Sequence, residues 1–139
     1  MYHWLTDLEL MAMLFAAAIH DAEHTGTTNE FHIATRSPLA ILYNDQAVLE
    51  NHHLSLTWSV LKQPDCNVLS KLDPEELEYF HELVQEMVLA TDMAQHFPQF
   101  NEIKNTIEST PKEYWKDVQD DKADYPVQYV FISTRPGQR

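Results

Sequence analysis

A long amphipathic helix pattern near the start of the chain most limits what the chain can fold into. In the segment TDLELMAMLFAAAIHD, residues 6–21, apolar side chains recur at intervals of three and four residues. The apolar run is too short to cross a bilayer, so no membrane span is expected. The pattern predicts a helix that buries one face inside a domain. The residues of that face are Leu10, Met11, Leu14, Phe15, Ala18 and Ile19.

Further helix signals follow along the chain. Ser37 before Pro38 is typical of a helix start, and residues 45–62 carry apolar side chains at helical spacing. Asp73, followed by a proline and two glutamates, begins a predicted helix that runs to residue 97. A weaker pattern covers residues 100–109. The sequence therefore predicts an all-α fold.

The character of the sequence changes after residue 109. Residues 110–139 have a charged first half, followed by the β-prone run VQYVFIS at 127–133. A single strand leaves its backbone hydrogen-bonding groups unpaired, and no second strand pattern precedes it. We predict one helical domain over residues 1–109 and a divergent, weakly docked tail over residues 110–139.

Charge and cysteine content restrict the partners and the compartment. The formal net charge is −13, with 22 acidic and nine basic residues, which argues against binding nucleic acid through the general surface. The single cysteine, Cys66, excludes a disulfide within the chain and suits a reducing compartment. We therefore expect a cytoplasmic protein.

The segment HDAEHTGTTN, residues 20–29, suggests a metal site. His20 and His24 are four residues apart and would share one face of a helix, with Asp21 nearby. Two imidazoles and a carboxylate form a plausible site for a divalent metal. The alternative is a polar helix end whose histidines are hydrogen-bonded locally.

The same segment also matches H-x-x-E-H, the pattern of inverted zinc proteases. In that interpretation His20 and His24 bind zinc and Glu23 is the base. A third ligand would come from Glu50 or His53. The pattern is five residues long, and it leaves Asp21 and Asn29 without a role.

Two further polar groups interrupt apolar helix patterns. Glu50 and two histidines lie in LENHH, where a buried carboxylate would need a partner such as a cation, a metal-held water or a histidine. A structural hydrogen-bond network of His52 and His53 is the alternative. Thr91, in LATDM, is either a site residue or part of an exposed polar pair, and the following Met93 fits a core as well as a pocket.

These motifs resemble those of the class I cyclic-nucleotide phosphodiesterases. HDAEHTGTTN resembles the family signature H-D-x-x-H-x-G-x-x-N, and YND, LENHH and VLATDM follow in the family's order and spacing. The flanking residues look most like the calcium/calmodulin-dependent subclass. Four ordered motifs over residues 1–109 are more specific than the protease pattern, so the metalloprotease becomes the secondary hypothesis.

The resemblance implies an all-α, HD-type catalytic domain that holds two metals, usually Zn²⁺ and Mg²⁺ (or Mn²⁺). Such a domain hydrolyses 3′,5′-cyclic AMP or GMP to the 5′-monophosphate. By the motif match, His20 would be a zinc ligand, Asp21 would bridge both metals, and His24 would orient the attacking hydroxide. The remaining implied residues are Glu50 and Thr91, which would hold waters of the second metal, and Met93, which would lie near the pocket wall.

The sequence also departs from the family. Ala22 stands where the family has a bulky apolar residue. The H-N-x-x-H segment, which would supply the general-acid histidine and a zinc ligand, is not found before His20, and the downstream ligand and base-binding residues are not found after residue 109. We therefore expect an incomplete and inactive piece of a phosphodiesterase, with any calmodulin-binding segment outside it. A non-catalytic helical binding module is the other alternative.

Overall fold

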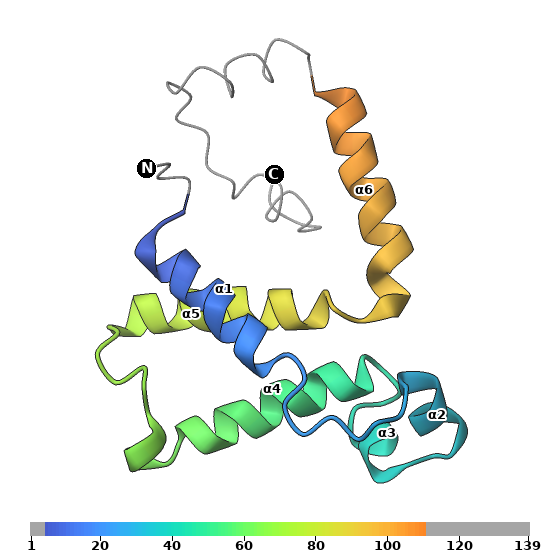
Figure 1. The fold of residues 1–139 in the computed structure, drawn as a ribbon, viewed down its shortest axis with the longest axis horizontal. Coiled ribbons are helices and arrows are strands. Elements are labelled where there is room, and N and C mark those ends of the chain that lie inside the picture. The colour runs from blue at the N-terminus through green and yellow to red at the C-terminus, as the bar shows by residue number, and fades with distance from the viewer. Residues whose placement is uncertain (1–4, 111–139) are drawn as a thin grey trace. The chain divides into compact units, whose positions relative to one another are not determined.

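The computed structural model describes residues 5–110, and within that range it contains helices and no strand (Figure 1). This confirms the predicted all-α fold. The predicted tail, residues 110–139, lies outside the described residues except for Thr110. The helices are α1 (Asp7–Ile19), α2 (Asn29–Ala34), α3 (Pro38–Leu42), α4 (Val48–Leu61), α5 (Pro74–Leu89) and α6 (His96–Ser109), with 3₁₀ turns η1 (Pro64–Cys66) and η2 (Met93–Gln95).

The chain divides into two compact units. Residues 7–93 form the unit that contains α1 to α5, and α6 belongs to the other unit. In the first unit α1 packs mainly against α5, and α4 contacts both (Figure 1). The helix predicted at 100–109 is confirmed as the later part of α6. Within residues 5–110 no helix has both the length and the apolar character needed to cross a bilayer.

Local side-chain chemistry starts two helices where the sequence predicts them. Asp73 accepts the backbone N–H of Glu76 at 2.9 Å, and Glu76 Oε2 accepts the N–H of Asp73 at 3.0 Å. This reciprocal capping box satisfies two backbone donors that helix geometry leaves free. Ser37 Oγ accepts the N–H of Ala40 at 3.2 Å, and Pro38 occupies the first turn of α3.

Other boundaries differ from the prediction. The helix expected to continue to residue 97 ends at Leu89. Thr91 Oγ1 donates to the carbonyl oxygen of Val88 at 2.7 Å. This carbonyl oxygen thereby gains a side-chain partner in place of a further helical N–H, which favours the end of the helix here. The helix expected from residue 45 begins at Val48, because Asp45 and Ala47 have positive φ angles of 62° and 39°.

The buried face of α1 agrees with the predicted one only in part, because Met11, Phe15 and Ile19 pack against the core but other predicted residues do not. Leu10 and Leu14 are 47% and 64% exposed, whereas Ala12 and Ala16 are buried. Ala12 and Ala16 have small side chains, which suits the packing of α1 against α5. The buried core consists of Ala12, Ala16, Leu54, Leu69, Phe80, Leu83, Val84 and Val88.

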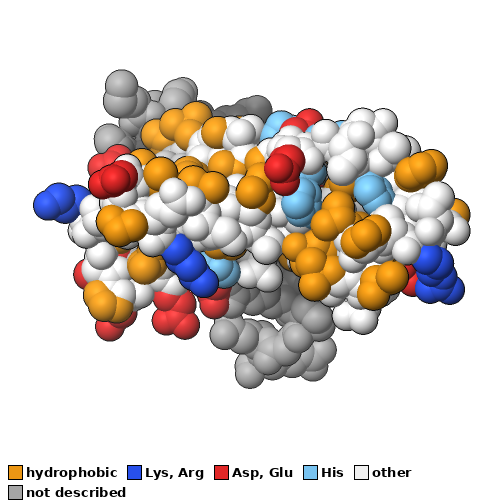
Figure 2. Space-filling view, turned by 90° about the horizontal axis from the view of Figure 1, so that it is seen from below, with side chains coloured by type: hydrophobic (Ala, Val, Ile, Leu, Met, Phe, Trp, Pro, Cys, Tyr) orange, Lys and Arg blue, Asp and Glu red, His pale blue; other side chains and the backbone are white. Residues whose placement is uncertain are grey.

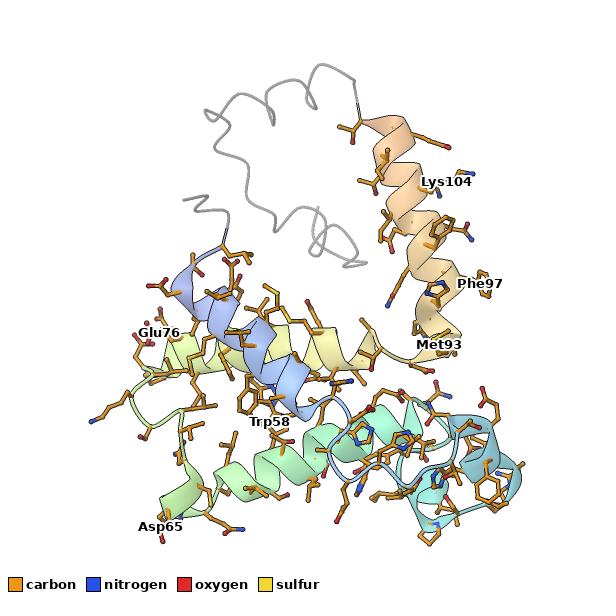
Figure 3. The ribbon with its side chains drawn as sticks, viewed as in Figure 1. Trp58, Asp65, Glu76, Met93, Phe97 and Lys104 are labelled. Carbon is orange, nitrogen blue, oxygen red and sulfur yellow. The ribbon has the colours of Figure 1, made fainter. Side chains whose placement is uncertain are left out.

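Aromatic rings complete the packing of α1, α4 and α5. The Phe15 ring lies 5.4 Å from the Phe80 ring and 6.2 Å from the Trp58 ring, measured between centroids. Trp58 projects from α4 toward α1 (Figure 3). Such pairs add to the stabilisation from apolar burial, so the last turns of α1 are held firmly where the chain enters HDAEHTGTTN.

Candidate functional site

The histidine-rich segment forms a turn after α1 and does not continue the helix. Helix α1 ends at Ile19, whose carbonyl oxygen accepts the N–H of Ala22 at 2.9 Å. The N–H of His24 then bonds to the carbonyl oxygen of Asp21 at 3.1 Å. The prediction that His20 and His24 share one helix face is therefore wrong, because the backbone leaves helical geometry between them.

His20 and Asp21 nevertheless lie side by side. His20 Nδ1 donates to the carbonyl oxygen of Ala17 at 2.8 Å, so the neutral ring keeps a lone pair on Nε2. That atom lies 3.5 Å from Asp21 Oδ2, and the two side chains are 46% and 68% exposed. A backbone-anchored imidazole beside a carboxylate is the type of donor pair that binds zinc and related divalent ions.

The neutral His24 ring carries its proton on the opposite nitrogen from His20. The N–H of Gly26 donates to His24 Nδ1 at 3.0 Å, so the proton of a neutral His24 ring is on Nε2. The ring stacks on that of His53, with centroids 5.8 Å apart. His24 can therefore donate a hydrogen bond from Nε2, whereas His20 can accept one or bind a metal there.

His53 is a structural histidine beneath this turn. Its side chain is 1% exposed, and Nδ1 donates to the carbonyl oxygen of Ala22 at 2.6 Å. Burial lowers the pKa of His53 and outweighs the bond to Ala22, which acts in the opposite direction. The neutral His53 ring therefore anchors the turn to α4. This agrees with the alternative in which His53 belongs to a structural hydrogen-bond network.

Glu50 is buried, and its partner is Asn29. Asn29 Nδ2 donates to Glu50 Oε2 at 2.8 Å and lies 3.5 Å from Oδ1 of the buried Asp92. Oδ1 of the same Asn29 side chain accepts the backbone N–H of Leu49 at 2.9 Å. Asn29 was not among the site residues predicted from the sequence, although it closes the motif that contains His20.

Thr91 and Met93 follow the end of α5, where Thr91 is bonded within its own turn and Met93 is exposed to solvent. The Thr91 hydroxyl is directed to the carbonyl oxygen of Val88 in its own turn. Met93 is 74% exposed, at the start of η2 (Figure 3). Their roles beside a metal and a pocket remain predictions.

The acidic residue of the protease pattern has another partner. Glu23 Oε2 lies 2.9 Å from His52 Nε2 on α4. Figure 2 shows histidine side chains reaching the surface close to acidic and apolar ones.

Among residues 5–110, no group of three or more His, Cys, Asp or Glu side chains is placed to hold a metal ion. The described part of the chain thus brings together two candidate ligands, His20 and Asp21.

Comparison with known proteins gives consistent matches. The family model described as 3′5′-cyclic nucleotide phosphodiesterase matches residues 1–133. The dual specificity calcium/calmodulin-dependent 3′,5′-cyclic nucleotide phosphodiesterase 1C of Mus musculus is 53% identical over 107 residues, covering 76% of this chain and 15% of the relative. The corresponding 1B protein of Bos taurus is 50% identical over 108 residues, covering 78% of this chain and 20% of the relative.

Solved structures agree. The phosphodiesterase domain of the RhoPDE fusion protein from the choanoflagellate Salpingoeca rosetta superimposes with a TM-score of 0.76 at 37% identity. The match covers 94% of this chain and 39% of that one. The matches to the two curated relatives cover a small part of their length, 15% of the mouse 1C protein and 20% of the bovine 1B protein.

Proposed function

Because the chain belongs to the 3′,5′-cyclic nucleotide phosphodiesterase family, we propose that it forms part of a catalytic domain that hydrolyses 3′,5′-cyclic AMP or GMP to the 5′-monophosphate. The observation that carries this proposal is the pair His20 and Asp21. His20 Nε2 lies 3.5 Å from a carboxylate oxygen of Asp21, and His20 Nδ1 is fixed by a backbone carbonyl.

The donor set fits part of a metal site. The family is metal-dependent, and His20 and Asp21 would contribute an imidazole nitrogen and a carboxylate to Zn²⁺ and Mg²⁺ (or Mn²⁺). Such ions, when bound, lower the pKa of water and neutralise charge on the attacked phosphate. They would also supply positive charge to a chain whose formal net charge is −13.

The other residues would orient water and substrate. His24 keeps its proton on Nε2 when neutral, because Gly26 N–H occupies Nδ1, so it can donate to an oxygen nucleophile. Glu50, held by Asn29, and Thr91 would accept hydrogen bonds from waters near the second metal. Met93 would contribute an apolar wall for the base. Residues 1–109 would form the catalytic part and residues 110–139 a divergent tail.

The longer protein would share the regulation of its relatives. The two curated relatives described above are named as calcium/calmodulin-dependent. We propose that calmodulin regulates the longer protein through a segment outside residues 1–139, and that the protein acts in the cytoplasm. The 139-residue chain by itself would have little activity, because its described part brings together two candidate ligands.

A chimera tests the proposal. Residues of this chain would replace the matched segment of the mouse relative, and hydrolysis of cyclic AMP and cyclic GMP would be measured with and without metal chelation. We expect chelator-sensitive turnover of at least one cyclic nucleotide that falls when Asp21 is replaced by Ala. A well-folded chimera without turnover, or one that does not respond to Asp21→Ala, would contradict the proposal.

A further inference from the structure

Glu23 is held in an unfavourable backbone conformation at the candidate metal turn. Its φ angle is 59°, in the left-handed region that residues other than Gly, Asn and Asp seldom adopt. The Glu23 carboxylate lies 2.9 Å from Nε2 of His52 on α4. A carboxylate only accepts, so His52 Nε2 carries the proton and donates. This contact joins residues 29 positions apart in the chain.

The neighbouring histidine of α4 makes a parallel contact with the same turn. His53 Nδ1 donates to the carbonyl oxygen of Ala22 at 2.6 Å. Consecutive histidines of α4 thus hold consecutive residues of the turn, one through the backbone and one through a side chain. Asp21 precedes these anchored residues directly, and His24 follows them.

We propose that the Glu23–His52 pair is a clamp that positions the turn of residues 20–24 on α4, so that Asp21 and His24 keep the orientations seen in this structure. Glu23 and His52 are positioning residues, and Glu23 does not act as the base of a protease. The clamp is a structural assignment, and its consequence for metal binding rests on the proposed function.

The burial of the pair supports a positioning role. The His52 side chain is 19% exposed and the Glu23 side chain is 65% exposed. The His52 ring is therefore largely shielded, and its centroid lies 6.2 Å from that of His53. Two exposed, mobile side chains would fix a backbone poorly, whereas here one partner is already packed on a helix.

Amide exchange in the 139-residue chain tests the clamp. The reporters are the N–H groups of Ala22, His24 and Gly26, each of which has an acceptor in the turn. Glu23→Asn removes the carboxylate, and Asn tolerates a positive φ better than Glu does. We expect exchange at these amides to rise about two- to fivefold in Glu23→Asn and in His52→Ala, a range typical of one partly exposed side-chain contact. The double variant should exchange no faster than the faster single variant.

A conservative variant and a matched control complete the design. Glu23→Gln keeps an oxygen that can accept from His52, so it should retain more protection than Glu23→Asn. Glu78→Gln, at an exposed position of α5, makes the same charge change and should leave the reporters unchanged. Slow exchange in α5 shows that each variant is folded. Unchanged reporters in Glu23→Asn, or fully additive effects in the double variant, would overturn the clamp.

Zinc titration by calorimetry separates the clamp from the function. If both hold, Glu23→Asn weakens Zn²⁺ binding by the same chain whereas Glu78→Gln does not. If the unaltered chain takes up no Zn²⁺ but the reporters respond as expected, the clamp stands and the proposed metal site fails. If Zn²⁺ binds and the reporters do not respond, the clamp fails and the metal site stands.

Discussion

Asn29 connects the first turn of α2 to a buried carboxylate on α4, because its Nδ2 donates to Glu50 Oε2 at 2.8 Å. Its Oδ1 accepts the backbone N–H of Leu49 at 2.9 Å, so one side chain satisfies both a charged acceptor and a backbone donor. Without it, a carboxylate that is 9% exposed would lose this partner.

We therefore expect Asn29→Ala to lower the free energy of unfolding by about 1–3 kcal/mol, the cost of leaving a buried polar group without its partner. Urea denaturation of the 139-residue chain measures this. Asn101→Ala, at an exposed position of α6, is the control and should change little. Equal stability of the Asn29 variant and the unaltered chain would contradict the structural role of Asn29.

The low pKa of buried His53 predicts a pH dependence. The unfolded chain takes up a proton at this histidine near its ordinary pKa of about 6.5, whereas the folded chain resists protonation until a lower pH. Stability from this group is therefore complete above about pH 6.5 and falls as the pH drops, by at most about 1.4 kcal/mol per pH unit.

Comparison with His53→Gln isolates this contribution from the other histidines. The variant should be less stable than the unaltered chain at pH 7.5, and the difference should shrink as the pH falls. Denaturation curves at several pH values from 5 to 8 give both trends. A constant difference would show that His53 is equally easy to protonate in the folded and unfolded chain.

Asp21 and Glu23 should differ in their effect on hydrolysis. In the chimera, Asp21→Ala would remove a proposed metal ligand, so it should cost more than the about 10–100-fold typical of residues that support ligands. Glu23→Ala should cost less, because Glu23 contacts His52 and not the proposed metal position. Turnover of both variants at saturating cyclic nucleotide decides this. An equal or larger loss from Glu23→Ala would contradict the assignment of Asp21 as a metal ligand.

The close approach of α1 to α5 makes Ala16 sensitive to size. Ala16 is 5% exposed in the core, so Ala16→Leu should overpack this contact and destabilise the chain by about 1–3 kcal/mol. Ala17→Leu makes the same change at the next residue, which is exposed, and should have little effect. Thermal unfolding compares them. Similar unfolding temperatures for the two variants would mean that Ala16 does not face the core.

Sequence alone was sufficient where the deciding interaction is local. The capping box of Asp73 and Glu76 and the Ser37–Pro38 helix start join groups at most three residues apart. A chain segment forms such bonds whatever the rest of the fold does, so their residue types can be read directly. The order and spacing of the phosphodiesterase motifs are likewise properties of the linear chain, so they too can be read from the sequence.

Tertiary structure decided which faces are buried and which polar groups meet. The sequence predicted Leu10 and Leu14 in the core, but the contact with α5 buries Ala12 and Ala16. The Asn29–Glu50 and Glu23–His52 contacts join residues 21 and 29 positions apart. Residue types and spacing cannot specify such pairs, because they form only after the helices pack and bring distant segments within hydrogen-bonding distance.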